Sequence, residues 1–417
     1  MPANLIWVIP ALSIALVITR PFKIPEYVWA TSGAALLLVL GLLTPREGLA
    51  GVAKGLDVYL FLTGMMLLAE TAREEKLFDW LAAHATQLAR GSARRLFLLI
   101  YLVGIVTTTF LSNDATAVVL TPAVASAVRA AKVPTPLPYL FICAFIANAA
   151  SFVLPISNPA NLVLYGAHMP PLLTWLPRYL LPASISIVAT YFLLRYTQRG
   201  ALDCSIERPT KLPTLGRGGQ VALGGIGFTA AALLVASALD LPLGLLTALA
   251  GTLTAGSVLV GARKSPATIV RNVSWSVLPL VAGLFVVVEA LNKTGITHAV
   301  TALLVAGAGQ SAASTAWLSG VGAALLCNVL NNLPAGLIAS NVLQAAPVSE
   351  TLRSAVLIGV DLGPNLSVTG SLATILWLLA LRRENVTVGA WQFLKLGALV
   401  MTGPLLLAIA SLFLLPQ

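Results

Sequence analysis

The sequence predicts an all-α membrane protein, and three of its properties lead to this fold class. Hydrophobic residues make up 58% of the 417 residues and charged residues only 10%, whereas soluble domains carry about 25% charged residues. The mean hydropathy is +0.91. The apolar residues gather in runs of the length that crosses a bilayer as a helix, about 20 residues. A soluble enzyme, a disordered protein and a disulfide scaffold are therefore excluded.

Twelve apolar stretches divide into two kinds. Ten are expected to span the membrane as helices: 5–19, 26–43, 54–71, 137–168, 175–195, 219–238, 241–260, 276–291, 352–381 and 392–415. The stretches 95–129 and 313–346 have arms that are short for a crossing, and they turn at the polar tips Ser112–Asp114 and Asn331–Asn332. Non-helical backbone at that depth is tolerated only inside protein or beside water. We expect both stretches to form re-entrant hairpins.

The basic residues predict the orientation of the chain. With the N-terminus outside, most of the 25 Lys and Arg residues fall in loops on the cytoplasmic side, as the positive-inside rule requires. The net charge of +10 therefore reports topology and does not indicate a nucleic-acid partner. We expect a multi-pass inner-membrane protein, in contact with membrane lipids, with both termini outside and the polar linker 196–218 in the cytoplasm.

The linker separates two halves, 1–195 and 219–417, that repeat weakly. Gly64 precedes Glu70 by six residues, as Gly283 precedes Glu289. Each half then holds a hairpin and a later helix that is interrupted by small polar residues, 137–168 in the first half and 352–381 in the second. Because one half begins outside and the other inside, the repeats are expected to be inverted, which is typical of transporters with a site at the repeat interface.

Four polar interruptions are expected to meet and bind a substrate. A helix that starts or stops inside the membrane leaves backbone N–H or C=O groups free, and Asn, Ser and Thr side chains add neutral donors and acceptors. Such a site is nearly uncharged and suits a small hydroxylated or oxyanionic solute. The candidate residues are Ser112, Asn113, Asp114, Ser157, Asn158, Asn161, Asn331, Asn332, Thr369, Gly370 and Ser371. The alternative is that the Asn side chains only satisfy hairpin turns and cap broken helices.

Asp114 and Asp361 are the carboxylates placed deepest in the predicted membrane region. A carboxylate buried there is costly and usually functional, so each is a candidate for proton coupling, with helix capping as the alternative. Glu70 and Glu289 lie near helix ends, where a solvated or interfacial carboxylate is the favoured interpretation.

The sequence motifs do not indicate a metal site, a cofactor or an enzyme activity. The three histidines do not cluster, and the three cysteines, Cys143, Cys204 and Cys327, are widely separated, so neither a metal site nor a disulfide framework is expected. The sequence contains no H-E-x-x-H, no G-x-S-x-G and no G-x-x-x-x-G-K-[ST] motif. We expect a transporter that has no cofactor and no ATPase motif of its own.

The most specific motif resembles a known family. Residues 359–364 (Gly-Val-Asp-Leu-Gly-Pro), followed by 369–377, resemble a signature of the arsenite efflux permeases, also called arsenical pump membrane proteins. Residues 110–115 and 331–334 resemble their hairpin tips, and 157–161 resembles the broken-helix motif of the wider ion transporter superfamily. Two positions depart from the family pattern: Val360 stands where Cys is common and Asn365 where Lys is common.

The resemblance implies export of trivalent arsenite, and of antimonite, from the cytoplasm in exchange for protons. It also implies a scaffold and a transport domain in each protomer, an elevator-type cycle, a homodimer and, for some members, a separate soluble ATPase subunit as partner. Two alternatives within the superfamily stay open: a sodium/proton antiporter, and a carrier of silicic acid or carboxylates.

Overall fold

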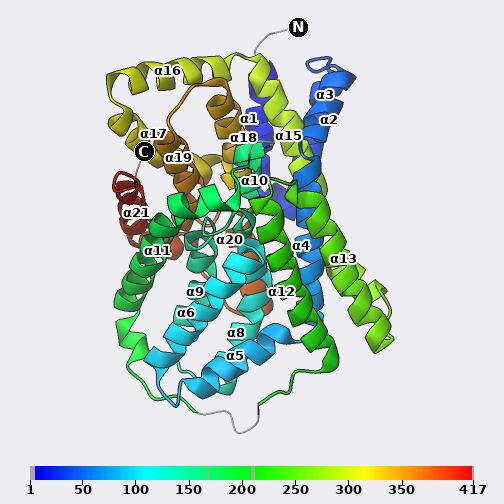
Figure 1. The fold of residues 1–417 in the computed structure, drawn as a ribbon, viewed down its shortest axis with the longest axis vertical. Helices are drawn as coiled ribbons and strands as arrows, with labels where there is room; N and C mark the ends of the chain where they lie inside the picture. Colours follow the sequence, from blue (N-terminus) through cyan, green and yellow to red (C-terminus); the bar gives the residue numbers. More distant parts are fainter. Residues whose placement is uncertain (1–4, 167–168, 208–211, 416–417) are drawn as a thin grey trace.

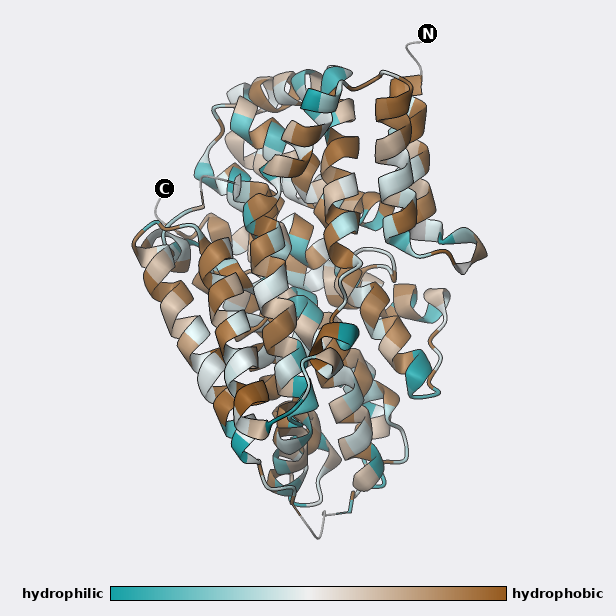
Figure 2. Ribbon diagram, turned by 90° about the vertical axis from the view of Figure 1, so that its right-hand side faces the viewer, coloured by the Kyte–Doolittle hydropathy of each residue, from teal (hydrophilic) through white to brown (hydrophobic). Residues whose placement is uncertain are grey.

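The computed structural model describes residues 5–166, 169–207 and 212–415, and its regular elements there are all helical. Six of the described helices are long and apolar enough to cross a membrane, or eight if two bent pairs each count as one span. Figure 2 shows that hydrophobic residues predominate along the long helices. The predicted fold class, an all-α membrane protein, is confirmed.

The first half contains helices α1 to α11. Their bounds are α1 Leu5–Thr19, α2 Glu26–Val39, α3 Pro45–Lys54, α4 Leu56–Glu74, α5 Leu77–Leu88, α6 Ala93–Phe110, α7 Asn113–Ala115, α8 Thr121–Ala130, α9 Leu137–Ala149, α10 Pro159–Tyr165 and α11 Leu172–Thr197. A π-helical turn, Thr116–Leu120, joins α7 to α8, and a 3-10 turn, Pro155–Ser157, precedes α10. The break in the stretch 95–129 therefore lies at residues 111–112, at the start of the predicted polar tip Ser112–Asp114, and Asn113 and Asp114 already belong to α7.

The second half contains helices α12 to α21. Their bounds are α12 Arg217–Ala238, α13 Leu243–Ala262, α14 Ala267–Asn272, α15 Val277–Lys293, α16 Ile296–Gln310, α17 Ala312–Leu330, α18 Asn332–Ala345, α19 Glu350–Leu362, α20 Leu372–Arg383 and α21 Ala390–Leu412. The hairpin arms α17 and α18 meet at Asn331, and a 3-10 turn, Gly363–Asn365, follows α19. The two interrupted helices predicted for 137–168 and 352–381 are thus α9 with α10, and α19 with α20, although residues 167–168 lie outside the described part.

Four helices lie in stretches that the sequence pattern assigned to loops: α3, α5, α14 and α16. They were missed because they are short or not uniformly apolar. Helix α3 begins with a capping box in which Thr44 and Glu47 bind each other's backbone N–H, and it meets α4 at a bend of 46°. Helix α16 has no buried residue and meets α15 at 71°. Figure 1 shows α16 running across the top of the molecule and α5 across the bottom.

The repeated glycines permit two close helix contacts. A Cβ atom on Gly64 of α4 would lie 2.1 Å from the carbonyl oxygen of Thr247 on α13. A Cβ on Gly283 of α15 would lie 2.7 Å from the carbonyl carbon of Ala30 on α2. Small residues let membrane helices approach closely. Each half therefore supplies a glycine-bearing helix that packs against a helix of the other half.

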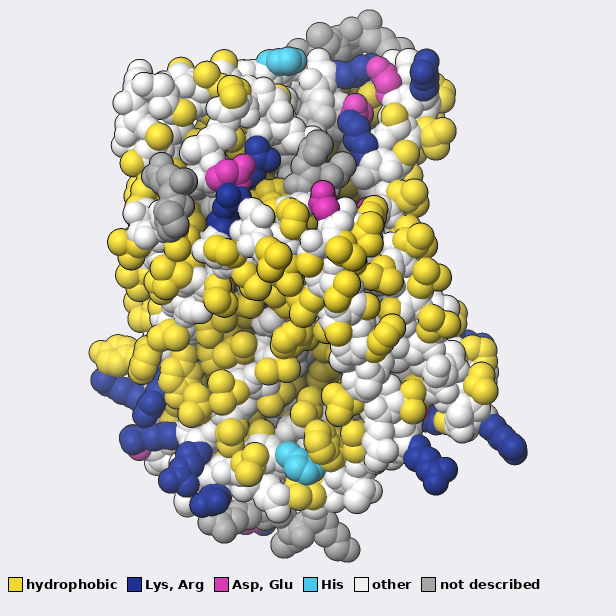
Figure 3. All heavy atoms as spheres, in the orientation of Figure 1, with side chains coloured by type: hydrophobic (Ala, Val, Ile, Leu, Met, Phe, Trp, Pro, Cys, Tyr) yellow, Lys and Arg dark blue, Asp and Glu magenta, His cyan; other side chains and the backbone are white. Residues whose placement is uncertain are grey.

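The polar connections lie at the two ends of the helices. The linker leaves α11 at the bottom of Figure 1 and returns at α12, whereas α1 lies toward the opposite side. Residues 208–211 of the predicted linker 196–218 lie outside the described part. Lys132 Nζ lies 2.8 Å from Glu207 Oε1, and Arg94 pairs with Asp203. Figure 3 shows charged side chains near both ends and a mainly hydrophobic surface between them.

Candidate functional site

The tip of the first hairpin is held by its own side chains. Ser112 caps α7, and its Oγ accepts a hydrogen bond from the N–H of Ala115 at 3.1 Å. Asn113 Oδ1 accepts from the N–H of Asp114 at 2.9 Å. These bonds occupy the side chains of Ser112 and Asn113. The Asp114 carboxylate has no hydrogen-bond partner among the described residues.

The first interrupted helix joins the hairpin to the second half. Ser157 Oγ donates to the Thr109 carbonyl at 2.9 Å. Asn158 caps α10 by accepting from the N–H of Ala160 at 3.0 Å, and its Nδ2 donates to Asp361 Oδ1 at 2.7 Å. Asn161 Nδ2 donates to the Ser151 carbonyl at 2.9 Å. Asn158 therefore caps a helix, which was the alternative to substrate binding, and it also binds a carboxylate of the second half.

The tip of the second hairpin binds the second interrupted helix. Asn331 has the left-handed φ of 74°, and its Nδ2 donates to the Thr369 carbonyl at 3.2 Å. The N–H of Asn332 donates to the Gly370 carbonyl at 2.9 Å. A Cβ at position 370 would lie 2.5 Å from Pro364 Cα, so only glycine fits this close approach. Ser371 caps α20 through the N–H of Thr374 at 3.1 Å.

Three asparagines that we did not select complete the network. Asn148 Nδ2 donates to Asn365 Oδ1 at 2.9 Å. Asn328 Nδ2 donates to the Gly363 carbonyl at 2.9 Å, and its Oδ1 accepts from Ser367 Oγ at 2.7 Å. Asn148 and Asn328 each stand in an otherwise apolar helix, and that isolation was the signal that could have identified them.

The structure thus brings the four interruptions together. Hydrogen bonds run from Thr109 through the Ser157 segment to Asp361, and from the Asn365 segment to Asn148, while the second hairpin binds residues 369–370. Within the described residues, this region leaves four buried oxygen atoms without a partner: the hydroxyl of Thr109, and the carboxylate and amide oxygens Asp361 Oδ2, Asn161 Oδ1 and Asn332 Oδ1. The last three carry the argument for a ligand. All three can accept a hydrogen bond, and buried acceptors are normally satisfied. A hydrogen-bond donor or a cation would satisfy these oxygens.

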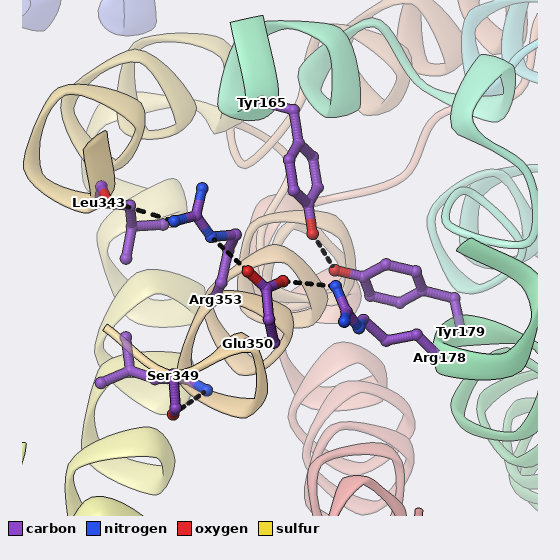
Figure 4. A network of polar contacts seen from close by, with 8 residues as sticks. Tyr165, Arg178, Tyr179, Leu343, Ser349, Glu350 and Arg353 are labelled. Carbon is purple, nitrogen blue, oxygen red and sulfur yellow. Dashed lines mark hydrogen bonds and ion pairs between the residues drawn. The ribbon is translucent and has the colours of Figure 1, made fainter. Parts of the chain in front are cut away.

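The far ends of α10 and α19 are tied to α11 by a separate network (Figure 4). The Tyr165 and Tyr179 hydroxyls lie 2.6 Å apart. Glu350 pairs with Arg178 and lies 3.7 Å from Arg353. These contacts fix the helices whose inner ends carry Asn158 and Asp361, so they position the candidate site without belonging to it.

The Asp114 carboxylate lines a small cavity. The cavity has a volume of about 60 Å³, and it lies between the first hairpin, α4, α10 and the loop before α15. Glu70 lies on its wall and is only 6% exposed, and Arg73 Nε donates to its carboxylate at 2.8 Å. The low exposure excludes a solvated carboxylate, whereas the place of Glu70 near the end of α4 and its pairing with Arg73 agree with the interfacial alternative. Glu289 lies at another cavity and pairs with Lys54 at 2.7 Å.

Sulfur and metal ligands are sparse in the described part of the chain. No three His, Cys, Asp or Glu side chains lie close enough there to hold a metal ion. The three cysteines are free, and Cys143 and Cys327 are buried. Cys327 Sγ lies 3.7 Å from the Val360 carbonyl. The polar groups of the site are therefore oxygen and amide groups.

Comparison with known proteins gives the family. Residues 14–363 match the model of the CitMHS family, described as "Citrate transporter". The chain belongs to the CitMHS family. It is therefore a membrane transporter, as the sequence predicted.

Relatives of this CitMHS protein include the arsenical pump membrane protein of Escherichia coli K12, which is 28% identical over 95% of this chain and 94% of its own. The arsenical pump membrane protein of Yersinia enterocolitica is 27% identical over 80% of each chain. An uncharacterized transporter of Mycobacterium tuberculosis is 25% identical over 96% of each. The resemblance to arsenical pump membrane proteins is confirmed.

Two solved transporters share the fold of this CitMHS protein. The YdaH transporter of Alcanivorax borkumensis aligns with a TM-score of 0.58 at 15% identity, over 97% of this chain and 98% of its own. MtrF of Neisseria gonorrhoeae aligns with a TM-score of 0.54 at 14% identity, over 89% and 84%. At this identity the likeness concerns the fold alone.

Proposed function

We propose that this CitMHS-family protein is a secondary transporter that exports trivalent arsenite, and antimonite, from the cytoplasm in exchange for protons. The observation that carries the proposal is the meeting of four helix interruptions around unpartnered oxygen acceptors, with Asp114 facing a cavity. The names of the arsenical pump relatives support the same solute.

The acceptors suit a neutral hydroxylated solute. Arsenous acid is mostly neutral at physiological pH and presents hydroxyl donors to Asp361 Oδ2, Asn161 Oδ1 and Asn332 Oδ1. A multiply charged carboxylate such as citrate would instead need cationic partners when it leaves water. Among the described residues, the Asp114 cavity is lined by the carboxylates of Glu70 and Asp114 and by no Lys or Arg. Citrate, which gives the family its description, is therefore not the solute that we propose for this chain.

Uphill export of a neutral solute requires coupling, because the membrane potential does no work on it. One proton moving down 100 mV supplies about 2.3 kcal/mol. Asp114 is the proposed proton carrier because its carboxylate faces the cavity without a hydrogen-bond partner among the described residues. Asp361, held by Asn158 at one oxygen, is the second proposed proton-coupling group.

We further propose two inverted repeats, 1–195 and 219–417, around a cytoplasmic linker, with both termini outside the inner membrane. Equivalent helices support this: α4 and α15 begin at residues 56 and 277, and α6 and α17 at 93 and 312, offsets of 221 and 219. In this proposal the protomer moves by an elevator-type cycle of a transport domain against a scaffold and forms a homodimer. A soluble ATPase subunit is a proposed partner, to be sought by co-purification.

Sodium is the second candidate driving ion. Three unpartnered oxygens in one region are the ligand type that hard cations take. A sodium/proton antiporter would need no metalloid. The experiment below separates the two functions.

The test is arsenite uptake into everted vesicles with an acid-inside pH gradient, with and without a sodium gradient. Asp114→Asn should abolish pH-driven uptake while the protein stays folded, because the amide cannot exchange a proton. Asp203→Asn, an exposed carboxylate of the linker, is the control and should transport normally. Unchanged uptake by Asp114→Asn would remove Asp114 from the mechanism. Sodium-dependent proton flux without arsenite would replace arsenite export by sodium/proton antiport.

A further inference from the structure

A second, larger cavity lies away from Asp114. Its volume is about 700 Å³, and it is bordered by the α3–α4 junction, α10, the α12–α13 turn, α15 and α18. These borders lie at the ends of α4 and α12 that are farther from the linker. We call this cavity the outer vestibule.

The outer vestibule adjoins the candidate site through two helices. Its wall includes Leu162 and Val163 of α10, and Leu337 and Ser340 of α18. Both helices begin at site residues, α10 after its cap Asn158 and α18 after its cap Asn331. The site and the vestibule wall are thus formed by successive parts of the same two helices.

The charges on the vestibule wall are unbalanced. The described charged residues that line it are Lys54, Asp57, Asp240 and Glu289. Lys54 and Glu289 form an ion pair at 2.7 Å and offset each other. Asp57 accepts from the N–H of Gly244 at 2.8 Å, and Asp240 is exposed. Within the described part neither Asp57 nor Asp240 forms an ion pair, so two carboxylates remain without a cationic partner. The chain as a whole carries the opposite sign, +10.

We propose that the outer vestibule is an electrostatic filter that excludes anions and admits neutral solutes and cations, with Asp57 and Asp240 as its specificity-determining residues. Clefts lined by one sign of charge between low-dielectric walls focus the field and change local ion concentrations by about tenfold or more. As an exit for the solute, the filter rests on the proposed function. It would let neutral arsenous acid leave, keep external carboxylates from the site, and raise the local proton concentration.

A single cysteine in the vestibule can measure this potential directly. Gln344 is exposed and lines the vestibule, so Gln344→Cys places a thiol there. Gln310, at the end of α16, is also exposed but does not line the cavity, so Gln310→Cys is the matched control. Cys204→Ser removes the native cysteine that is not buried. The full chain in lipid nanodiscs is then treated with a cationic and an anionic methanethiosulfonate reagent of similar size.

We expect the cationic-to-anionic rate ratio to be about tenfold higher at position 344 than at position 310, and to fall when salt is raised. The double substitution Asp57→Asn/Asp240→Asn should bring the ratio close to that of the control. Asp240 has a left-handed φ of 56°, which asparagine also adopts readily. Because Asp57 caps a neighbouring helix, Asp240→Asn alone is the second variant and should give part of the decrease.

Equal ratios at the two positions, or a ratio at position 344 that neither variant changes, would overturn the filter. The measurement uses no arsenite, so it can fail while arsenite export stands. The proposed function can also fail while the filter stands. This would be the result if the protein did not export arsenite but position 344 still reacted much faster with the cationic reagent.

Discussion

The hydrogen bond between Asn158 and Asp361 should be a main support of the site, and Asn158→Ser tests it. Asn158 makes two contacts, the cap of α10 through Oδ1 and the 2.7 Å bond from Nδ2 to Asp361. Serine is as good a helix cap as asparagine but is too short to replace the second contact. The substitution therefore removes the bond to Asp361 and keeps the cap.

The magnitude follows from the burial of the two side chains. Asn158 is 1% exposed and Asp361 0%, and the second oxygen of Asp361 already lacks a partner. A buried hydrogen bond to a charged group contributes about 1.5–3 kcal/mol, and a neutral one about 0.5–1.5 kcal/mol. We expect Asn158→Ser to lower the free energy of unfolding by about 2 kcal/mol. The same change in an Asp361→Asn background, where the bond is neutral, should cost about 1 kcal/mol.

Unfolding in mixed micelles, followed by tryptophan fluorescence, gives the four free energies of this double-mutant cycle. A coupling of about 1 kcal/mol supports the bond. Distant, independent sites add to within about 0.5 kcal/mol, so additivity at that level would refute the reasoning. Loss of arsenite uptake by Asn158→Ser without loss of stability would assign Asn158 to the solute and not to Asp361.

Two further predictions concern the packing around the site. Gly359→Ala should lower the unfolding free energy by about 2 kcal/mol, because the new Cβ would lie 2.1 Å from the Gly320 carbonyl oxygen. Gly322→Ala is the control, because a Cβ at that position would have no atom within 4 Å. Equal thermal stability of the two variants would contradict the prediction. Asn328→Ala should cost about 2 kcal/mol, since two hydrogen bonds at about 1 kcal/mol each are lost. Thermal unfolding and arsenite uptake check the second variant, and wild-type values for both would exclude Asn328 from the network.

The sequence predicted the long apolar helices and the hairpin tips because both depend on local properties. A run such as 312–330 is mainly apolar and carries no charged residue, and the pair Asn331–Asn332 follows it visibly. The prediction failed for α3, whose start depends on a capping box and whose polar residues look the same in a loop and in a short helix. It also failed for α16, which is apolar but is separated from α15 by a bend of 71°.

The partners within the site could not be predicted for a different physical reason. The bond from Asn158 to Asp361 joins residues 203 positions apart, and the pair of Asn148 and Asn365 spans 217. Such distances are set by how the two halves pack, which no local pattern records. The burial of Glu70 could not be predicted for the same reason, since it depends on the wall that the hairpin and the loop before α15 build beside α4.

The fold alone does not identify the transported solute. The charges near the site reduce the range of possible solutes. YdaH and MtrF share the fold at 14–15% identity, and a shared fold at this identity does not identify a solute. At position 365, where the arsenite permeases that this sequence resembles commonly carry Lys, this chain places a buried Asn bonded to Asn148 and to the Phe145 carbonyl. A neutral amide there leaves Asp361 without a cation one helical turn away. Solute selection in this CitMHS protein should then depend on the hydrogen-bond acceptors inside the site and on the fixed carboxylates outside it. Both groups disfavour an anion, because an anion cannot donate to the acceptors and is repelled by the carboxylates.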